Sequence, residues 1–336
     1  MVAGTTVLFS QPTITSNFNP TFGYTAKIVM ADTLGVAEGA AGANMVYDFS
    51  SLSQVGNEIT YDYILPANTP YGSKYPGATL SFLSQTTTGG AGFTYLKTSA
   101  SGYEILGVAT AEMQLVYSNS QVFAQYPVTY NSTFTDNFAG QGTNTQGFTT
   151  HRKGTSTSVA DAWGTLKLPQ GTFTNVLRIK TTQEVRDSIN FMGTDFVSVS
   201  RAVSYSFFRD DIQQQLLTIN YLTFVDPLSG NESTSKTVMY YPETATNNPS
   251  SVQNAEKAFE GNIYPNPATS QITFTPQAGA SHYIITDVLG RLYNSQPIVA
   301  TEPQTVDVSA LPQGVYTISL YNGTMLLGTQ KFTLFK

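Results

Sequence analysis

The feature that most constrains this chain is a repeated alternation of apolar and polar residues in short runs that end at turn sequences. In residues 24–30, 58–64 and 113–117, apolar side chains fall mostly on every second position. A period of two places these side chains on one face of a β-strand, so each run predicts a strand with one buried face. Turn sequences such as Tyr75-Pro76-Gly77 separate the runs. The fold class is therefore predicted to be all-β, with residues 1–241 forming one or two large β-sandwiches.

The composition favours the same fold class. The chain holds 20 Tyr and 20 Phe, and aromatic and β-branched residues fit the pleated, half-buried surface of a sheet. Charged residues make up 11% of the 336 residues, well below the roughly 25% of a typical soluble domain. The polar residues are instead mainly uncharged, such as Thr, Ser and Asn, which is typical of secreted proteins. Residues 34–43 include three glycines, each of which weakens a helix by roughly 1 kcal/mol relative to Ala, so a loop is predicted there.

Charge and cysteine content exclude several classes of protein. The net charge of −6 and the pI near 4.9 argue against nucleic acid as a partner, because phosphate binding requires clustered Lys and Arg. Cysteine is absent, which excludes disulfides and thiolate metal sites. No run of about 18 apolar residues is present, so no membrane-spanning segment is predicted. Residues 1–5 lack the features of a secretory signal, so if the protein is exported we expect these residues to belong to a mature form with an added Met.

Two domain boundaries are predicted from shifts in composition. Residues 242–261 are rich in small and polar residues and contain few large apolar ones, so they should behave as a linker between two folded parts. A second boundary near residue 120 would divide residues 1–241 into two sandwiches. Within this first part, residues 131–157 are rich in Gly, Thr and Asn and predict a long exposed loop or a twisted hairpin.

Residues 262–336 predict a small immunoglobulin-like β-sandwich. Asn322-Gly323 lies between two strand patterns and is a strong hairpin signal, because both residues tolerate positive φ. The segment also carries four motifs in a fixed order. These are Tyr264-Pro265-Asn266-Pro267-Ala268, Asp287 with Gly290-Arg291, Leu311-Pro312-Gln313-Gly314-Val315-Tyr316, and the terminal Lys336.

In this order, the four motifs resemble the type A C-terminal sorting domain of the type IX secretion system of the Bacteroidota, over the full length of the segment. The resemblance implies entry into the periplasm by a cleaved signal peptide, recognition at the outer membrane, and translocation to the cell surface or the extracellular space. The implied partners are the outer-membrane machinery and a sortase-like protease that cuts before about Ile263, leaving the cargo released or attached to surface lipopolysaccharide. The implied recognition surface centres on Gly314, Tyr316 and the terminal strand that ends at Lys336.

Two stretches of the first part, residues 160–169 and 171–178, resemble segments in the N-terminal regions of other proteins that carry this sorting domain. Most of those proteins have no assigned activity. This second resemblance therefore implies uncharacterised surface β cargo and no particular chemistry.

Candidate catalytic residues are few. Nucleophilic triads and zinc sites use histidine, and the chain has only His151 and His282. His151 lies beside two basic residues, which disfavours a general base, and His282 is expected at a strand edge of the sorting segment. Glycosidases use paired carboxylates, for which the candidates are Asp210 with Asp211, Glu184 with Asp187, and Asp161 near Trp163. Neighbouring residues on a strand point to opposite faces, so Asp210 and Asp211 are poorly placed to act as a pair and are predicted to mark a turn. We predict no enzyme activity and no cofactor.

Ligand binding is the second kind of candidate function. Aromatic side chains on a sheet face can stack on sugar rings, which makes Trp163 a candidate glycan contact, with Tyr221, Tyr240 and Tyr241 nearby. The alternative is that these side chains belong to the core. Calcium loops use closely spaced Asp and Asn, but residues 226–231 are more simply explained as a turn, so no metal site is predicted.

Two tripeptides, Asp32-Thr33-Leu34 and Asp187-Ser188-Ile189, resemble the O-glycosylation signal of exported proteins of the same bacterial group. The resemblance implies modification at Thr33 and Ser188. An intact-mass measurement would detect it.

We expect a secreted or cell-surface, non-catalytic β protein with a structural or adhesive role, including a component of a filament or surface layer. Exposed strand edges can pair between subunits, so self-association belongs to this hypothesis. The alternative is a carbohydrate-binding protein or glycoside hydrolase that acts on extracellular polysaccharide. A pocket with two carboxylates at catalytic spacing would favour that alternative.

Overall fold

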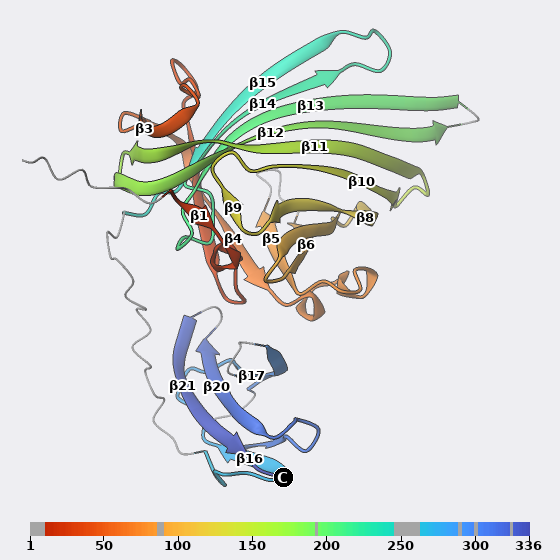
Figure 1. Ribbon diagram of the computed structural model, residues 1–336. Coiled ribbons are helices and arrows are strands. Elements are labelled where there is room, and N and C mark those ends of the chain that lie inside the picture. The colour runs from red at the N-terminus through yellow and green to blue at the C-terminus, as the bar shows by residue number, and fades with distance from the viewer. Residues whose placement is uncertain are drawn as a thin grey trace, which may run out of the picture. The chain divides into compact units, whose positions relative to one another are not determined.

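The computed structural model describes residues 11–85, 91–191, 194–244, 263–287, 291–298, 302–322 and 325–336 (Figure 1). The chain divides into two compact units, residues 1–247 and residues 248–336. Most of the predicted linker, residues 242–261, lies outside the described residues. Within the described ranges, no helix is long and apolar enough to cross a membrane.

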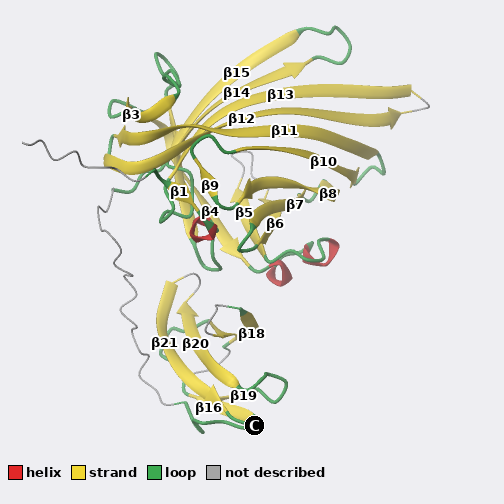
Figure 2. Cartoon of the chain, viewed as in Figure 1, coloured by secondary structure: helices red, strands yellow, loops and turns green. Residues whose placement is uncertain are grey.

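The first unit consists mainly of strands, as Figure 2 shows, which confirms the all-β prediction. The helical segments in its described residues are short 3₁₀ turns at Ser16–Phe18, Pro66–Asn68 and Gly72–Lys74. The strands are β1 (Thr13–Ile14), β2 (Thr25–Ala31), β3 (Gly42–Asp48), β4 (Gln54–Ile64), β5 (Leu80–Gln85), β6 (Ala91–Thr98), β7 (Gly102–Ala109), β8 (Met113–Gln125), β9 (Val128–Thr129), β10 (Thr133–Asn144), β11 (Thr149–Leu168), β12 (Gly171–Phe191), β13 (Thr194–Phe208), β14 (Leu217–Val225) and β15 (Glu232–Tyr240).

Twelve of these strands form one closed, barrel-like sheet. The order around the ring is β10-β8-β7-β6-β5-β4-β2-β15-β14-β13-β12-β11, and pairing between β11 and β10 closes it. The pairs of the ring are antiparallel. The predicted sandwich is therefore not confirmed for this unit. Alternation shows that one face of each strand is buried, but closure depends on pairing between strands distant in the sequence.

The long strand β11 closes the ring and also extends it. Residues 149–159 pair with β10, which makes residues 131–157 a long hairpin, one of the two alternatives predicted for them. Residues 162–167 of β11 pair in parallel with β3, so β3 occupies the edge that β10 leaves free. Residue 120, where an internal boundary was considered, lies inside the continuous strand β8 of the ring.

Two core clusters lie on opposite faces of the closed sheet. The first cluster joins side chains from distant strands of the ring, such as Leu96 of β6 and Leu177 of β12, so it lies inside the ring. The second lies on the outer face of β11 to β15, where Tyr47 of β3 packs edge-on against Phe207 at 5.0 Å between ring centres. Val176 and Leu177 belong to different clusters, because successive side chains of a strand point to opposite faces.

The second unit contains two sheets that share a core. Its strands are β16 (Gln271–Phe274), β17 (His282–Asp287), β18 (Leu292–Pro297), β19 (Gln304–Asp307), β20 (Gly314–Asn322) and β21 (Met325–Leu334). Strands β18-β17-β20-β21 form a four-stranded sheet, and β16 pairs with β19. Phe274 of the smaller sheet meets Ile318 and Phe332 of the larger sheet in one cluster. Strands β20 and β21 pair from Asn322 and Met325 onward, as expected of a hairpin at this position.

Candidate functional site

The entry motif of the second unit connects its two sheets. Tyr264 exchanges two backbone hydrogen bonds with Thr273 of β16, with N···O distances of 2.9 and 2.7 Å. Four residues later, the Ala268 amide donates to the Thr333 carbonyl of β21 at 2.8 Å. The two prolines of the motif carry no N–H and cannot donate to either sheet. The backbone of this motif therefore joins the smaller sheet to the terminal strand.

Asn266 supplies hydrogen bonds that its flanking prolines cannot make. Its Oδ1 accepts from the Thr333 amide at 2.9 Å, and its Nδ2 donates to the Lys331 carbonyl at 3.4 Å. Both partners belong to β21, so the Asn266 side chain makes the hydrogen bonds to β21 that a paired strand residue would make through its backbone. Tyr264 is 52% exposed and can contact another molecule.

Asp287, at the end of β17, is bound to Arg291, the residue before β18. Arg291 donates to the Asp287 carboxylate from its amide at 3.0 Å and from Nε at 2.6 Å. The hydrogen bond to Asp287 raises the pKa of Arg291. The Asp287 side chain is 9% exposed and that of Arg291 is 68% exposed, so the carboxylate is largely buried while the guanidinium faces solvent. Gly290, predicted as part of this motif, lies outside the described residues.

Tyr316 lies in the core of the second unit. It is 3% exposed, its ring stacks on Phe332 at 5.6 Å, and its hydroxyl donates to the Pro312 carbonyl at 2.7 Å. Burial raises the pKa of this hydroxyl. Gly314 pairs with Leu334 at the opposite end of the hairpin. Tyr316 therefore holds the terminal strand from the inside, and its side chain is not part of the accessible surface.

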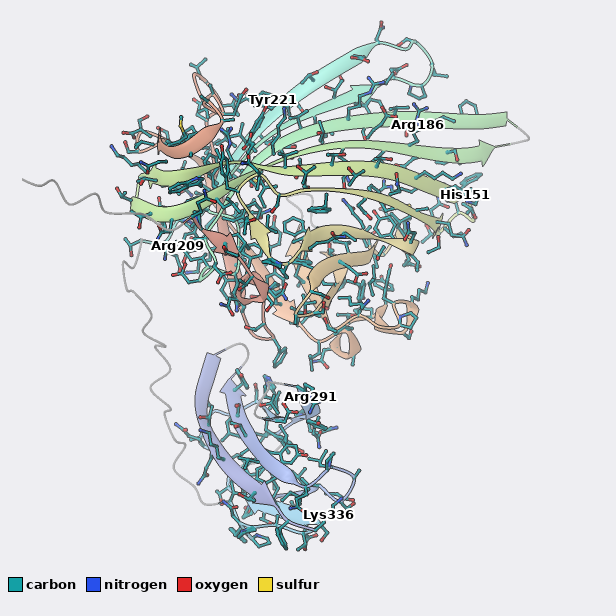
Figure 3. All side chains as sticks on the ribbon, in the orientation of Figure 1. His151, Arg186, Arg209, Tyr221, Arg291 and Lys336 are labelled. Atoms are coloured by element: carbon teal, nitrogen blue, oxygen red, sulfur yellow. The ribbon has the colours of Figure 1, made fainter. Side chains whose placement is uncertain are left out.

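Apolar side chains reach the surface beside the buried motif residues. Val315 is 41% exposed and Phe335 is 62% exposed. Val315 pairs with Thr333, two residues before Phe335, so both side chains lie on the outward face of the hairpin. The sequence analysis did not single them out, although the inward position of Tyr316 implies an outward Val315. Lys336, labelled in Figure 3, donates from Nζ to the Ser309 carbonyl.

Comparison with known proteins identifies this second unit. Residues 262–334 match the family described as "Secretion system C-terminal sorting domain". No curated protein and no solved structure matches the chain. The chain thus carries a type IX secretion sorting domain, which supports its being a cargo of that system. The domain implies export to the cell surface or the extracellular space.

The predicted sugar-stacking residues of the first unit lie mainly in its core. Trp163 is 8% exposed and belongs to the cluster inside the ring. Tyr240 is 6% exposed. Tyr221 and Tyr241 are partly buried and donate their hydroxyls to Glu38 at 3.0 Å and to Glu243 at 2.8 Å, respectively. These four side chains do not form a flat exposed platform.

The candidate carboxylate pairs are held by cations or by hydrogen-bond donors. Asp161 is bound by Arg178, Asp187 by Arg152, Glu184 by Arg186 and Arg201, and Asp211 by Arg209. Asp210 accepts from the Thr15 amide at 2.5 Å and lies between β13 and β14, where a turn was predicted. Hydrogen bonds from Arg201 and Arg186 lower the pKa of Glu184, whereas a general acid needs a raised pKa.

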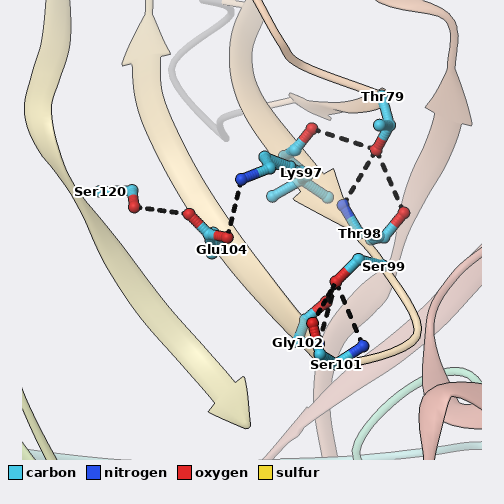
Figure 4. A network of polar contacts seen from close by, with 9 residues as sticks. Thr79, Lys97, Thr98, Ser99, Ser101, Gly102, Glu104 and Ser120 are labelled. Carbon is cyan, nitrogen blue, oxygen red and sulfur yellow. Dashed lines mark hydrogen bonds and ion pairs between the residues drawn. The ribbon is translucent and has the colours of Figure 1, made fainter. Parts of the chain in front are cut away.

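Glu104 on β7 shows the same structural use of a carboxylate (Figure 4). It accepts from the Ser120 Oγ of β8 at 2.6 Å and from the Lys97 Nζ of β6 at 3.1 Å. The hydrogen bond from Ser120 is the main cause that lowers the pKa of Glu104. This side chain therefore links three neighbouring strands of the ring.

The two histidines lie on strands of different units. His151 is exposed on β11, where it pairs with Gln141 of β10 and Ser188 of β12. His282 lies on β17, its ring stacked on Tyr321 at 5.2 Å, and burial lowers its pKa. His151 pairs with the neighbour of Asp187, so the alternation of side chains along the strands places His151 and Asp187 on opposite faces of the sheet.

The remaining candidate sites are turns, loops and strand positions. In the described part of the chain, no group of three or more His, Cys, Asp or Glu could hold a metal ion. Asp226 accepts from the amides of Leu228 and Ser229 at 3.0 and 2.6 Å, as in the predicted turn. Thr33 lies in the non-helical loop after β2, whereas Ser188 lies within β12 and is paired on both sides.

Arg178 of β12 lies at the centre of a group of polar contacts that the sequence analysis did not predict. It is 1% exposed and donates from Nε and Nη2 to Asp161 at 2.8 and 2.9 Å. Its Nη1 donates to the Glu38 and Gly39 carbonyls at 2.7 and 3.1 Å, and its guanidinium lies 5.1 Å from the Tyr47 ring centre. This buried ion pair therefore holds the loop after β2 against the outer face of the sheet.

Proposed function

We propose that this chain is a non-catalytic cargo of the type IX secretion system with a structural or adhesive role at the cell surface. The observation that carries the proposal is the sorting domain at residues 262–334. The candidate carboxylates of the first unit add support, because each of these side chains is already held in an ion pair with an arginine. A host among the Bacteroidota, passage through the periplasm and removal of the domain by a sortase belong to the same proposal.

The secretion machinery would contact the outward face of the terminal hairpin. Val315 and Phe335 supply exposed apolar surface there, of the kind that marks protein interaction sites. Asn266, Asp287 and Tyr316 would act indirectly, by holding β21 and the start of β18 in place.

Deletion of Gln330 to Lys336 in a native host tests the export proposal. The deletion removes part of β21, so we expect the protein to accumulate in the periplasm. A matched control is Leu228→Ser, which changes an 84% exposed side chain in the first unit and should be delivered normally. Surface delivery of the deletion variant at the level of the unchanged protein would refute the role of the terminal strand.

The structural role would use the open edge of β15. In the described residues, positions 238–240 pair with β2, whereas residues 232–237 pair with β14 alone. An unpaired edge can accept a strand from another copy. Electron microscopy of the purified protein should show polymers, and a uniform population of monomers would argue against assembly.

Carbohydrate binding is the second candidate function. One observation favours it, a depression on the outer face of the closed sheet whose lining includes Lys153, Glu184 and Arg186. Glu184 is the carboxylate in this lining, and two arginines already hold it. The depression therefore suits binding of a sugar better than hydrolysis, which requires two carboxylates.

A further inference from the structure

The open depression lies over β8, β10, β11 and β12 of the closed sheet. Its volume is about 570 Å³, which falls within the range of small-molecule sites. Arg186, labelled in Figure 3, belongs to its lining from β12. Most of its polar lining residues are exposed, as expected for the outer face of the ring, and Glu184 is half-buried.

The floor of the depression carries a small side chain where β10 and β11 meet. Ala139 of β10 and Gly154 of β11 belong to its lining. A Cβ on Gly154 would lie 2.1 Å from the ring of the buried Phe138, so this glycine makes room for Phe138 on the opposite face of the strand pair and does not itself shape the depression. A register shift next to Ala139 pairs it with Asn119 of β8. Such bulges re-aim side chains, and this one brings Asn119 to the rim.

The rim carries an excess of positive charge. Lys153 on β11 pairs directly with Arg186 on β12 in the ladder, and like charges in this position repel each other. Glu184 lies 3.0 Å from Arg186 and 3.1 Å from Arg201, so its single negative charge is divided between two arginines. None of the ion pairs in the described part of the chain includes Lys153. In a chain with a net charge of −6, this local basic site favours an acidic ligand.

Amide and hydroxyl groups on the rim are held in position. Thr155 donates from Oγ1 to the Asn137 Oδ1 at 2.8 Å, and Asn119 donates from Nδ2 to the Asn137 carbonyl. The first bond leaves the two Nδ2 hydrogens of Asn137 as donors to a ligand. Amide donors beside the apolar surface of Ala139 match a sugar ring, which presents hydroxyls at its edge and C–H groups on its face.

We propose that this depression binds an acidic polysaccharide, with a uronic-acid carboxylate between Lys153 and Arg186. Neighbouring sugar hydroxyls accept from Asn119 and Asn137. Because the depression is open, a polymer can lie across it without threading. The inference rests on the proposed adhesive role, since it names the ligand through which the exported protein attaches to other material.

Calorimetric binding of oligogalacturonate to the full chain tests this site. Lys153→Gln removes the unpaired charge, and we expect binding at least about tenfold weaker, as for loss of a charged hydrogen bond. Ala139→Leu fills the depression without changing its charge and should weaken binding to a similar extent. Lys97→Gln, an exposed lysine of β6 outside the depression, is the matched control and should bind like the unchanged protein.

Three outcomes would overturn the assignment. Equal affinities of all variants would show that oligogalacturonate binds elsewhere or not at all. Equally tight binding of a neutral malto-oligosaccharide would contradict the charge argument, and displacement by an equal concentration of inorganic phosphate would show recognition of charge without sugar. Trp163 fluorescence verifies that each variant is folded. Cell fractionation of Lys153→Gln tests export separately, because this variant should still reach the surface.

Discussion

Arg178 shows how a fold without disulfides can use a buried charge. Moving a guanidinium out of water costs several kcal/mol unless a well-placed partner compensates it. The guanidinium of Arg178 donates four hydrogen bonds, two to the Asp161 carboxylate and two to carbonyls of the loop after β2. The same guanidinium attaches the loop after β2 to β12, so Arg178 both neutralises Asp161 and fixes the position of the loop.

Arg178→Met should lower the free energy of unfolding of the first unit by about 3–5 kcal/mol, because Asp161 is left buried without its partner. Trp163 is the single Trp of the chain and lies inside the ring. Its fluorescence during urea unfolding therefore reports on the first unit. Arg201→Met is the matched control, since Arg201 is 47% exposed in its ion pairs and such pairs contribute about 0–1 kcal/mol.

Changing both members of the buried pair separates charge from packing. Arg178→Met combined with Asp161→Leu leaves no uncompensated charge, so we expect it to recover part of the stability that the single variant loses. If Arg178→Met cost no more than Arg201→Met, the buried pair would not be a major source of stability.

Asn266→Ala should loosen the terminal strand of the sorting domain. The substitution removes an acceptor from the Thr333 amide and a donor to the Lys331 carbonyl, which should cost about 1 kcal/mol. Hydrogen exchange at the Thr333 amide is the measurement, and we expect it to be roughly fivefold faster. Gln296→Ala, at an exposed position of β18, should leave this rate unchanged. Unchanged exchange in Asn266→Ala would mean that backbone pairing alone holds β21.

Among the elements, β3 depends on close approach to β11. A Cβ on Gly164 would lie 2.0 Å from the Met45 carbonyl oxygen, and its φ of +155° is unfavourable for other residues. Gly164→Ala should therefore displace β3 and destabilise the first unit by at least about 2 kcal/mol, measured by Trp163 fluorescence in urea. Gly230 has a φ of +69° and no atom near its Cβ position, so Gly230→Ala should cost only about 1 kcal/mol of backbone strain. Equal losses in the two variants would contradict the steric argument.

The sequence predicts strands better than it predicts their closure. Alternation in residues 24–30 and 113–117 is enough to place β2 and β8, because burial of one face is a local property. Closure of the ring depends on pairings such as Ala31 with Val238, which no local pattern marks. The depression at Lys153 was likewise not foreseen, since it depends on a bulge between β8 and β10 and on the register in which β10, β11 and β12 pair. The sorting motifs could be recognised because they lie in one short segment.

At the scale of the whole molecule, the sorting domain and the candidate ligand site lie in separate units. The motif residues Asn266, Asp287 and Tyr316 make their contacts within the second unit, and the candidate ligand residues lie in the first. Substitutions can therefore be chosen that change export without touching the cargo fold. Val315 and Phe335 are suitable, because their side chains are exposed and their removal leaves the core cluster intact.

Val315→Ser combined with Phe335→Ser should reduce surface delivery severalfold in a native host, because it removes the apolar contact area proposed for the secretion machinery. Immunoblots of periplasmic and surface fractions give the delivered share, with Gln296→Ser as the exposed control within the same domain. Hydrogen exchange at Thr333 distinguishes the two possible causes of a defect. Normal exchange with lost delivery supports direct recognition of this face. Normal delivery would refute it, and exchange as fast as in Asn266→Ala would assign the defect to a loosened terminal strand.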